Sequence, residues 1–263
     1  MNDGTGKHRA KKQFGQHFLH ERRYIELIVH AVNPKPGQRV AEIGPGLGAI
    51  TRPLIEKLGR LTVIELDRDV IAPLTAKVAG LGELDVVLAD VLTVDFTAIA
   101  DGQPLRLVGN LPYNISSPIL FHALAHRQAI QDMHFMLQKE VVDRMAADPG
   151  SKVYGRLSVM LQAYCRVEAL FDVPPGAFTP PPKVDSAVVR LIPRDESDIG
   201  IRDHARFESL VKAAFAQRRK TLRNTLRDIA TTEQMEAVGI DPAARAEAIG
   251  VRDYVTLSNS LHN

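Results

Sequence analysis

A glycine-rich segment at residues 42–48 is the first place where the chain could bind a small molecule. Its sequence is E-I-G-P-G-L-G. Because glycine has no Cβ, Gly44 and Gly46 let the backbone pass close to a ligand. The third glycine comes one residue too early for the G-x-G-x-x-G fingerprint of dinucleotide binding. Taken alone, the segment indicates either a cofactor loop or a plain turn.

Two acidic residues further along the chain suit the rest of a nucleoside. Glu65 lies about twenty residues beyond the glycine segment, where an acid can accept hydrogen bonds from ribose hydroxyls. Asp67 is the alternative for that position. Asp90 could accept from the exocyclic amine of an adenine. Each acid alone is compatible with a solvated strand end. The glycine segment and the two acids together, in this order, suit a nucleoside cofactor. Because they include no binding site for a pyrophosphate, they favour S-adenosylmethionine over NAD.

A fourth segment, Asn110-Leu111-Pro112-Tyr113, indicates either a reaction centre or an ordinary proline turn after a strand. It is similar to the (D/N/S)-P-P-Y motif of amino-methylating enzymes. The lone pair of an adenine N6 amine is delocalised, so the amine is a poor nucleophile. The Asn110 side-chain oxygen and the main-chain carbonyl of Leu111 or Pro112 could hold its two hydrogens and free that lone pair. Proline would fix the backbone, and Tyr113 would stack on the base.

Phe178 is a further candidate for the base-binding site. It lies in a proline-rich segment, A-F-T-P-P-P, that should be stiff. An adenine must leave its stack to reach such a pocket. We therefore expect the Phe178 ring either to cover the second face of the base or to belong to the core of the loop.

Alternating strand and helix patterns predict the elements that must position these residues. Strands are expected at 39–43, 61–65, 84–90, 105–109, 133–137, 168–173 and 187–192, the last as an edge or late strand, with helices at 24–32, 51–58, 68–78 and 139–147. Residues 158–164 fit a helix or a strand. Such alternation predicts an α/β fold with a doubly wound, Rossmann-like parallel sheet. The candidate residues would then share the carboxyl edge of the sheet, where ligands bind.

The charge distribution suggests two further regions. Residues 1–23 carry six Lys or Arg against two acids, and residues 206–227 carry seven against Glu208, although the net charge of the chain is only +2. We expect residues 1–15 to be a mobile basic arm. Residues 1–195 would form the catalytic domain, and 196–263 a small all-helical domain. Two basic regions on an acidic body favour a polyanionic partner, although a solvated surface is the alternative.

The bulk composition excludes several classes of protein. The longest apolar runs fall short of the roughly 18 residues of a membrane span, and the polar N-terminus does not resemble a secretory signal. Cys165 is the only cysteine, so an internal disulfide is impossible, and a cytoplasmic protein is expected. No metal site is predicted.

With these motifs in place, the chain resembles the KsgA/RsmA family of small-subunit ribosomal RNA adenine N6,N6-dimethyltransferases over nearly its full length. The resemblance is carried by the motifs above and by further segments that occur in the same order, at 13–19, 63–67, 109–116, 136–141, 154–159, 178–187 and 217–224. It implies a class I methyltransferase fold and S-adenosylmethionine as cofactor. It also implies dimethylation of two adjacent adenosines near the 3′ end of 16S rRNA, in a pre-30S particle, by a monomer.

The resemblance also implies roles for particular residues. Cofactor contacts would come from His17, Leu19, Gly44, Glu65, Asp90 and Asn110. Members of the family often have asparagine where this chain has His17, so the chain departs from the family pattern there. RNA contacts would come from the C-terminal basic residues, Lys212, Arg218, Arg219, Lys220, Arg223 and Arg227. Lys212, Arg219, Arg223 and Arg227 are expected near one face of a C-terminal helix.

Three other functions are considered. An Erm-type methyltransferase of large-subunit rRNA would share the fold and the reaction, but the segments 136–141 and 154–159 favour the small-subunit family. A non-catalytic RNA-binding assembly factor is disfavoured by the intact motif at 110–113. An NAD-dependent dehydrogenase is disfavoured by the glycine spacing and by the lack of a candidate proton relay.

Overall fold

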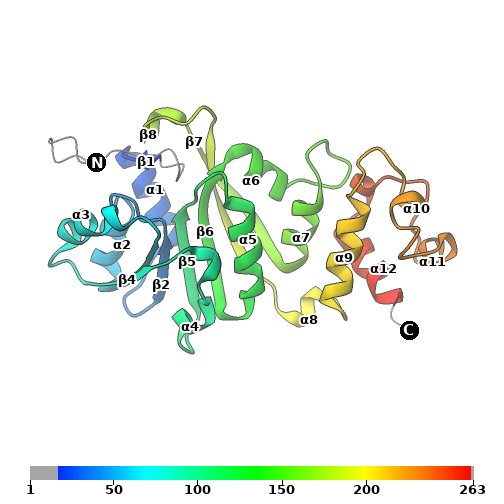
Figure 1. Cartoon of the computed structure of the whole chain (residues 1–263), viewed down its shortest axis with the longest axis horizontal. Coiled ribbons are helices and arrows are strands. Elements are labelled where there is room, and N and C mark those ends of the chain that lie inside the picture. The colour runs from blue at the N-terminus through cyan, green and yellow to red at the C-terminus, as the bar shows by residue number, and fades with distance from the viewer. Residues whose placement is uncertain (1–16, 262–263) are drawn as a thin grey trace. The chain divides into compact units, whose positions relative to one another are not determined.

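The computed structural model describes residues 17–261 (Figure 1). The expected basic arm, residues 1–15, lies outside the described residues. The described chain divides into two compact units. The first comprises the residues up to Val142 together with Glu168–Pro193, and the second comprises Asp143–Val167 and the residues from Arg194 onward.

A seven-stranded sheet forms the first unit, in the order β4–β3–β2–β5–β6–β9–β7. Its strands are β2 (Arg39–Ile43), β3 (Arg60–Glu65), β4 (Glu83–Leu88), β5 (Leu105–Asn110), β6 (Ile130–Gln138), β7 (Cys165–Val173) and β9 (Ser186–Pro193). The strands β2 to β6 pair in parallel, and β9 pairs antiparallel with β6. The prediction of a doubly wound parallel sheet is confirmed. The strand at 187–192 is the last strand in chain order, as one of the two alternatives expected, but it is not an edge strand because β7 lies outside it.

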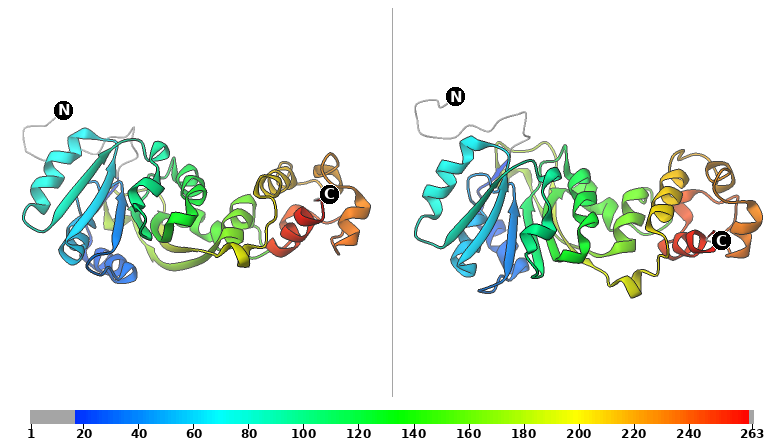
Figure 2. Two further views of the ribbon diagram at one scale, coloured as in Figure 1. Left: turned by 90° about the horizontal axis from the view of Figure 1, so that it is seen from below. Right: turned by 60° about the horizontal axis from the view of Figure 1, so that its bottom comes forward.

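Helices lie on both sides of this sheet (Figure 2). They are α1 (Arg22–Val32), α2 (Thr51–Leu58), α3 (Arg68–Val78), α4 (Phe96–Ala100), α5 (Ser116–Ala125) and α6 (Lys139–Met145). Each buries one apolar stripe, as Ile28, Val29 and Val32 of α1 do in the main hydrophobic core. The sequence analysis did not predict α5, which begins at Ser116, shortly after the Asn110–Tyr113 motif.

A buried ion pair connects β5 to β6. Arg106 donates to both carboxylate oxygens of Asp132, at 2.9 and 2.8 Å, and both side chains are almost fully buried. Arg106 also donates to the Val32 carbonyl at the end of α1, at 2.7 Å. The pair therefore joins two neighbouring strands and a covering helix at one point.

A two-stranded ribbon lies apart from the main sheet. β1 (Phe18–Leu19) pairs antiparallel with β8 (Phe178–Thr179), so Phe18 is opposite Thr179 and Leu19 is opposite Phe178. The sequence analysis did not predict this pairing. It brings His17, at the start of the described chain, to the proline-rich segment.

The second unit is built mainly from helices. They are α7 (Arg156–Tyr164), α8 (Glu196–Ile199), α9 (His204–Ala214), α10 (Leu222–Thr225), α11 (Thr232–Ala237) and α12 (Val251–Ser260). Residues 158–164 are therefore helical. The segment Asp143–Val167, which the sequence analysis placed in the first domain, groups with this unit because α7 packs on α9 and α12. The change to the second unit at Arg194 lies beside the expected boundary near residue 195.

Among the described residues, none of the helices combines the length and the apolar character that a bilayer span requires.

Candidate functional site

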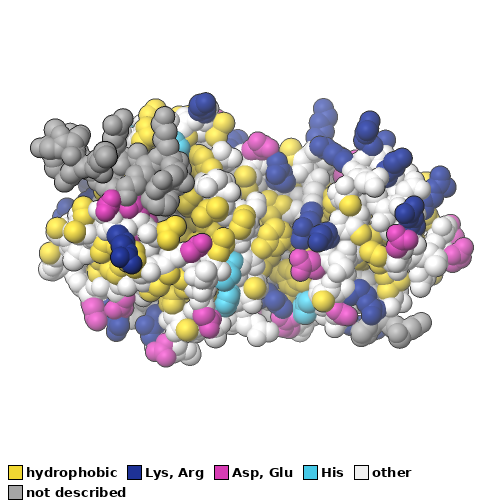
Figure 3. All heavy atoms as spheres, in the orientation of Figure 1, with side chains coloured by type: hydrophobic (Ala, Val, Ile, Leu, Met, Phe, Trp, Pro, Cys, Tyr) yellow, Lys and Arg dark blue, Asp and Glu magenta, His cyan; other side chains and the backbone are white. Residues whose placement is uncertain are grey.

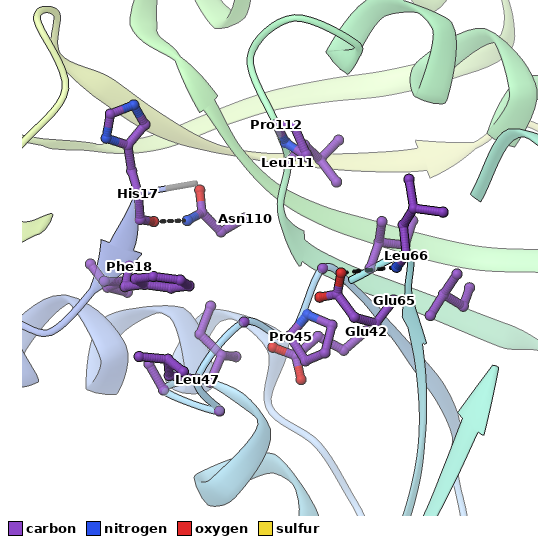
Figure 4. Close-up of a pocket in the computed structure, with 18 of the residues that line it drawn as sticks. His17, Phe18, Glu42, Pro45, Leu47, Glu65, Leu66, Asn110, Leu111 and Pro112 are labelled. Carbon is purple, nitrogen blue, oxygen red and sulfur yellow. Dashed lines mark hydrogen bonds between the residues drawn. The ribbon is translucent and has the colours of Figure 1, made fainter. Parts of the chain in front are cut away.

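A cavity of about 1040 Å³ opens at the carboxyl ends of the strands in the first unit (Figure 4). Its wall contains the glycine segment after β2, Glu65 at the end of β3, Asp90 after β4 and Asn110 at the end of β5. These strands lie on either side of the point where the strand order reverses, between β2 and β5. The fold therefore brings together the four motifs that the sequence singled out.

The glycine segment needs the backbone freedom that its sequence provides. Gly44 and Gly46 have φ angles of +66° and +51°, which side-chain-bearing residues rarely adopt. A Cβ at Gly46 would lie 3.1 Å from the Phe18 ring, because Phe18 packs directly on this turn. Phe18 is a wall residue that the sequence analysis missed, since only the β1–β8 pairing brings it there.

Glu65 and Asp90 are both held by backbone N–H groups. Glu65 Oε1 accepts from Leu66 N at 2.9 Å and from Asp67 N at 2.8 Å, and Asp90 Oδ1 accepts from Leu92 N at 3.0 Å. Burial raises the pKa of Glu65 above its ordinary value, although these backbone contacts oppose the rise. Asp90 keeps its second oxygen for a ligand, and the Glu65 carboxylate also lies beside the Gly46 backbone N–H. Asp67, the alternative to Glu65, caps α3 instead and does not line the cavity.

Glu42 is a second buried acid in the wall, to which the sequence analysis gave no role. It is 2% exposed, and its Oε2 atom has no hydrogen-bond partner among the described residues. Burial, with a smaller contribution from the nearby Glu65 carboxylate, raises the pKa of Glu42 to about 7. A cationic group in the cavity would compensate this buried carboxylate.

Apolar side chains line the cavity between Glu65 and Asp90. Leu66 is 53% exposed, although it is a large aliphatic residue, and Val91 and Leu92 lie on the next loop. A leucine directly after a strand-end acid is a signal that the sequence analysis could have used. These residues form a surface on which a flat aromatic ring can pack.

Asn110 is oriented by a backbone contact. Its Nδ2 atom donates to the His17 carbonyl at 2.9 Å, and this leaves Oδ1 as an acceptor (Figure 4). The Pro112 carbonyl accepts from Ile115 N at 3.2 Å. The Tyr113 hydroxyl is 2.6 Å from Oγ of Ser186, a buried residue at the start of β9. The Asn110–Tyr113 loop is thus tied to three other segments.

The Phe178 ring is buried beside the two-stranded ribbon. Its ring is 2% exposed and belongs to the main hydrophobic core, with Leu19 as its partner across the β1–β8 ribbon. Phe178 does not line the cavity, whereas its neighbour Thr179 does. Successive residues of a strand point to opposite sides, so the core position of Phe178 turns Thr179 towards the cavity. The second of the two expectations for Phe178, a core position, is the one that this geometry supports.

His17 and Leu19 both contribute to the cavity wall. Leu19 is almost fully buried, at 5% exposure, and also belongs to the core. The His17 ring stacks on Tyr113, with ring centroids 5.6 Å apart and planes inclined by 24°. The ring therefore lies beside the Asn110–Tyr113 motif.

The six C-terminal basic residues are all exposed and lie in the second unit. They do not share one helix face, because α9 ends at Ala214 and Arg218, Arg219 and Lys220 lie in the turns before α10. Arg218 donates to the Lys152 carbonyl at 2.6 Å, which holds this segment to the loop before α7. Lys and Arg side chains gather over this part of the unit (Figure 3).

No group of three or more His, Cys, Asp or Glu side chains within the described range 17–261 could hold a metal ion.

Comparisons with known proteins agree with this architecture. The family model for ribosomal RNA adenine dimethylase matches residues 7–263. The ribosomal RNA small subunit methyltransferase A of Xanthomonas campestris pv. campestris (strain B100) is 67% identical over 250 residues, which cover 95% of each chain. The protein of the same name from Xanthomonas oryzae pv. oryzae (strain PXO99A) is 66% identical over the same share.

Two solved structures resemble the whole chain. A dimethyladenosine transferase from Plasmodium falciparum has a TM-score of 0.77 at 26% identity and covers 92% of this chain and 96% of its own. The 23S rRNA methyltransferase ErmE has a TM-score of 0.73 at 27% identity, covering 94% of this chain and all of its own. Since the family model and the relatives match almost every residue, the chain belongs to the ribosomal RNA adenine dimethylase family.

Proposed function

We propose that this chain transfers methyl groups from S-adenosylmethionine to the N6 amines of two adjacent adenosines near the 3′ end of small-subunit ribosomal RNA. One observation carries the proposal. A single cavity contains the nucleoside-binding features of three strand ends together with the Asn110–Tyr113 loop. Cofactor and reacting amine would therefore meet in one enclosed space, which supplies the proximity that a transfer reaction needs.

The cavity fits the cofactor group by group. The Glu65 carboxylate would accept from the ribose hydroxyls, and Asp90 from the adenine amine, with Leu66 against the ring. Gly44 and Gly46 would allow the amino-acid end to approach the backbone beside the His17–Leu19 segment. The unpartnered oxygen of Glu42 lies on this side of the cavity and suits a cation. When bound, the cofactor supplies an activated methyl group on a sulfonium.

The Asn110–Tyr113 loop would hold the adenine amine. Asn110 Oδ1 accepts one N6 hydrogen, because Nδ2 is engaged by the His17 carbonyl. Of the two carbonyls considered for the other hydrogen, that of Pro112 already accepts from Ile115 N, which favours Leu111. With both hydrogens held, the N6 lone pair is directed at the methyl group. Tyr113, fixed by Ser186, offers its ring to the base.

The reaction needs little acid–base help from the protein. A proton leaves only after N6 has become cationic, so alignment and electrostatics carry most of the catalysis. In the second transfer N6 keeps a single hydrogen. One acceptor then suffices, and the first methyl must fit where the other hydrogen had been.

The RNA partner would be a pre-30S particle, bound by a monomer in the cytoplasm. The exposed basic residues of the second unit, Lys212, Arg218, Arg219, Lys220, Arg223 and Arg227, support this view. They would contact phosphates, which orient the protein without reading the sequence. The 66–67% identical relatives are named as small-subunit methyltransferases, which favours the small subunit over the large one.

The proposal is tested by incubating the protein with labelled S-adenosylmethionine and immature 30S particles, followed by mass spectrometry of the rRNA. We expect label in N6,N6-dimethyladenosine at two adjacent positions near the 3′ end. Protein-free 23S rRNA is the parallel substrate, chosen because ErmE shares the fold. Methylation of 23S rRNA alone would contradict the assignment to the small subunit, and no methylation of either would contradict the proposed reaction.

A further inference from the structure

The loop that would recognise the cofactor's adenine is held from outside by a histidine. Its residues 90–92 line the cavity, and the loop ends at Val94, before α4. His122 Nε2, on α5, lies 2.8 Å from the Val94 carbonyl, and because a carbonyl oxygen only accepts, Nε2 carries the hydrogen. We infer that His122 is a positioning residue, which acts through Val94 to place Asp90 for the adenine amine of the cofactor. This inference rests on the proposed function and adds to its cofactor site a residue outside the cavity wall.

Hydrogen bonds within the loop connect Val94 to Asp90. Thr93 N donates to the Asp90 carbonyl at 2.9 Å, and Val94 N donates to the Val91 carbonyl at 3.2 Å. The Asp90 side chain belongs to the same turn, since its Oδ1 atom accepts from Leu92 N at 3.0 Å. Asp90 is thus bonded through its carboxylate and through its carbonyl to the turn that ends at Val94. A shift of Val94 therefore moves the Asp90 carboxylate as well.

The His122 ring is itself fixed by aromatic neighbours. Phe96, the first residue of α4, is fully buried, and its ring centroid lies 5.1 Å from that of His122 and 5.4 Å from that of His126. His126 Nδ1 donates to the His122 carbonyl at 3.0 Å, and its Nε2 atom lies 3.4 Å from Asp95 Oδ1. Two histidines one turn apart on α5 therefore contact two successive residues, Val94 and Asp95. A ring packed in this way has few rotamers open to it, so its hydrogen bond to the loop has a fixed direction.

The helix that carries His122 also belongs to the reaction side of the cavity. α5 begins at Ser116, shortly after the Asn110–Tyr113 loop, and its buried Ile119 lines the cavity. His122 lies three residues further along the helix, which packs on the turn η2 (Val91–Thr93). One helix thus follows the loop that would hold the target base and supports the loop that would hold the cofactor's adenine.

A comparison of two ligands separates positioning of Asp90 from a purely structural contact. S-adenosylhomocysteine and S-inosylhomocysteine differ at position 6 of the purine, where the second carries an oxygen in place of the amine. Calorimetry on the whole protein measures both Kd values. We expect the native chain to bind S-adenosylhomocysteine about 10–100-fold more tightly, the effect of one hydrogen bond to a charged group.

Variants of His122 should remove this preference without removing binding. His122→Phe and His122→Leu lack the donor, and in both the ratio of the two Kd values should fall to about threefold or less, because only S-adenosylhomocysteine loses affinity. His122→Gln places an amide N–H near the position of Nε2 and should keep most of the ratio. His30→Phe, at an exposed histidine on α1, is the control and should keep all of it. The unchanged Kd for S-inosylhomocysteine shows that each variant is folded.

Three results would overturn the inference. They are an unchanged ratio in both donor-free variants, equal weakening of the two ligands in them, and a native chain that binds both ligands equally, since Asp90 would then not recognise the amine. A native chain that binds neither ligand would instead contradict the proposed function, which the rRNA methylation assay tests separately.

Discussion

Asn110 has two hydrogen-bonding atoms, and the fold uses them differently. Nδ2 is engaged by the His17 carbonyl, so Oδ1 is the atom available to the reacting amine. We predict that Asn110→Ala loses both methyl transfers and lowers kcat/KM by about 10²–10³-fold, the usual cost of one oriented transition-state contact. Product mass spectrometry with labelled S-adenosylmethionine measures this. An Asn110→Ala protein that still produces dimethyladenosine at the native rate would contradict the role of Oδ1.

The proposed reaction needs space for a second methyl group beside Tyr113. Asn114 is exposed, lines the cavity and directly follows Tyr113, so it can be enlarged with little cost to folding. We expect Asn114→Phe to stall the reaction at N6-methyladenosine, whereas the smaller Asn114→Ala should still dimethylate. The ratio of monomethyl to dimethyl product is the measurement. Variants that give only unmodified and dimethylated rRNA would contradict the proposal that two oxygen atoms of this loop hold the two N6 hydrogens.

Glu42 makes the stability of the free protein pH-dependent. Its pKa is about 7 in the fold against an ordinary 4.5, so between these values the folded protein keeps a proton that the unfolded chain has released. Its contribution is present below pH 4.5 and is lost as the pH rises through 7. Because one pKa unit corresponds to about 1.4 kcal/mol, the free energy of unfolding should fall by up to about 3 kcal/mol over this range.

The matched variant for this effect is Glu42→Gln, which keeps the shape and removes the charge. Urea unfolding at pH 5 and pH 8 should show a smaller loss in this variant than in the native chain, and greater stability than the native chain at pH 8. Burial also raises the pKa of Glu65, so part of the pH dependence of the free energy of unfolding should persist in Glu42→Gln. An unchanged slope in Glu42→Gln would show that Glu42 is charged in the fold throughout.

At the scale of the elements, the Arg106–Asp132 pair joins β5, β6 and the end of α1. Removing one partner leaves a buried charge without compensation. We predict that Asp132→Ala lowers the free energy of unfolding by about 3–5 kcal/mol. The control is Glu56→Ala, which breaks the exposed Arg52–Glu56 pair on α2 and should cost less than about 1 kcal/mol. If urea unfolding showed equal losses of stability in Asp132→Ala and Glu56→Ala, the buried pair would have no special role in joining these elements.

The β1–β8 ribbon is the element that completes the site. It consists of two residues from each of two distant segments, yet it determines the positions of His17, Phe18, Phe178 and Thr179. The turn at Gly46, the stacking partner of Tyr113 and the orientation of Asn110 all depend on it. Small changes in this ribbon should therefore affect the base and cofactor ends of the cavity together.

At the scale of the whole molecule, the basic residues of the second unit should determine the salt dependence of RNA binding. Each lost phosphate contact reduces the slope of log K against log salt by about 0.7–0.9. We predict a reduction of this size in Lys220→Gln and a uniformly weaker affinity for 30S particles. Lys57→Gln, which makes the same change at an exposed site on α2, is the control. Equal slopes in the two variants would mean that Lys220 is only solvated.

The sequence by itself predicted several of the polar residues that line the cavity. Strands and their polar ends follow from local alternation. The sequence therefore predicts that the glycine turn, Glu65, Asp90 and Asn110 lie at one edge of a parallel sheet. Asp90 was identified even though the strand before it ends at Leu88. The positions of these residues at strand ends depend mainly on their neighbours in the chain, so local sequence patterns predict them well.

Only the tertiary structure decided which side chains meet across the cavity. Phe178 entered the core, His17 came to lie on Tyr113, Asp67 became a helix cap, and the basic residues spread over turns instead of one helix face. Leu66 and Phe18 joined the wall for the same reason. These outcomes depend on pairing and packing between segments as far apart as His17 and Pro180. No local periodicity encodes such contacts, because their free energy arises only when the folded chain buries both partners together.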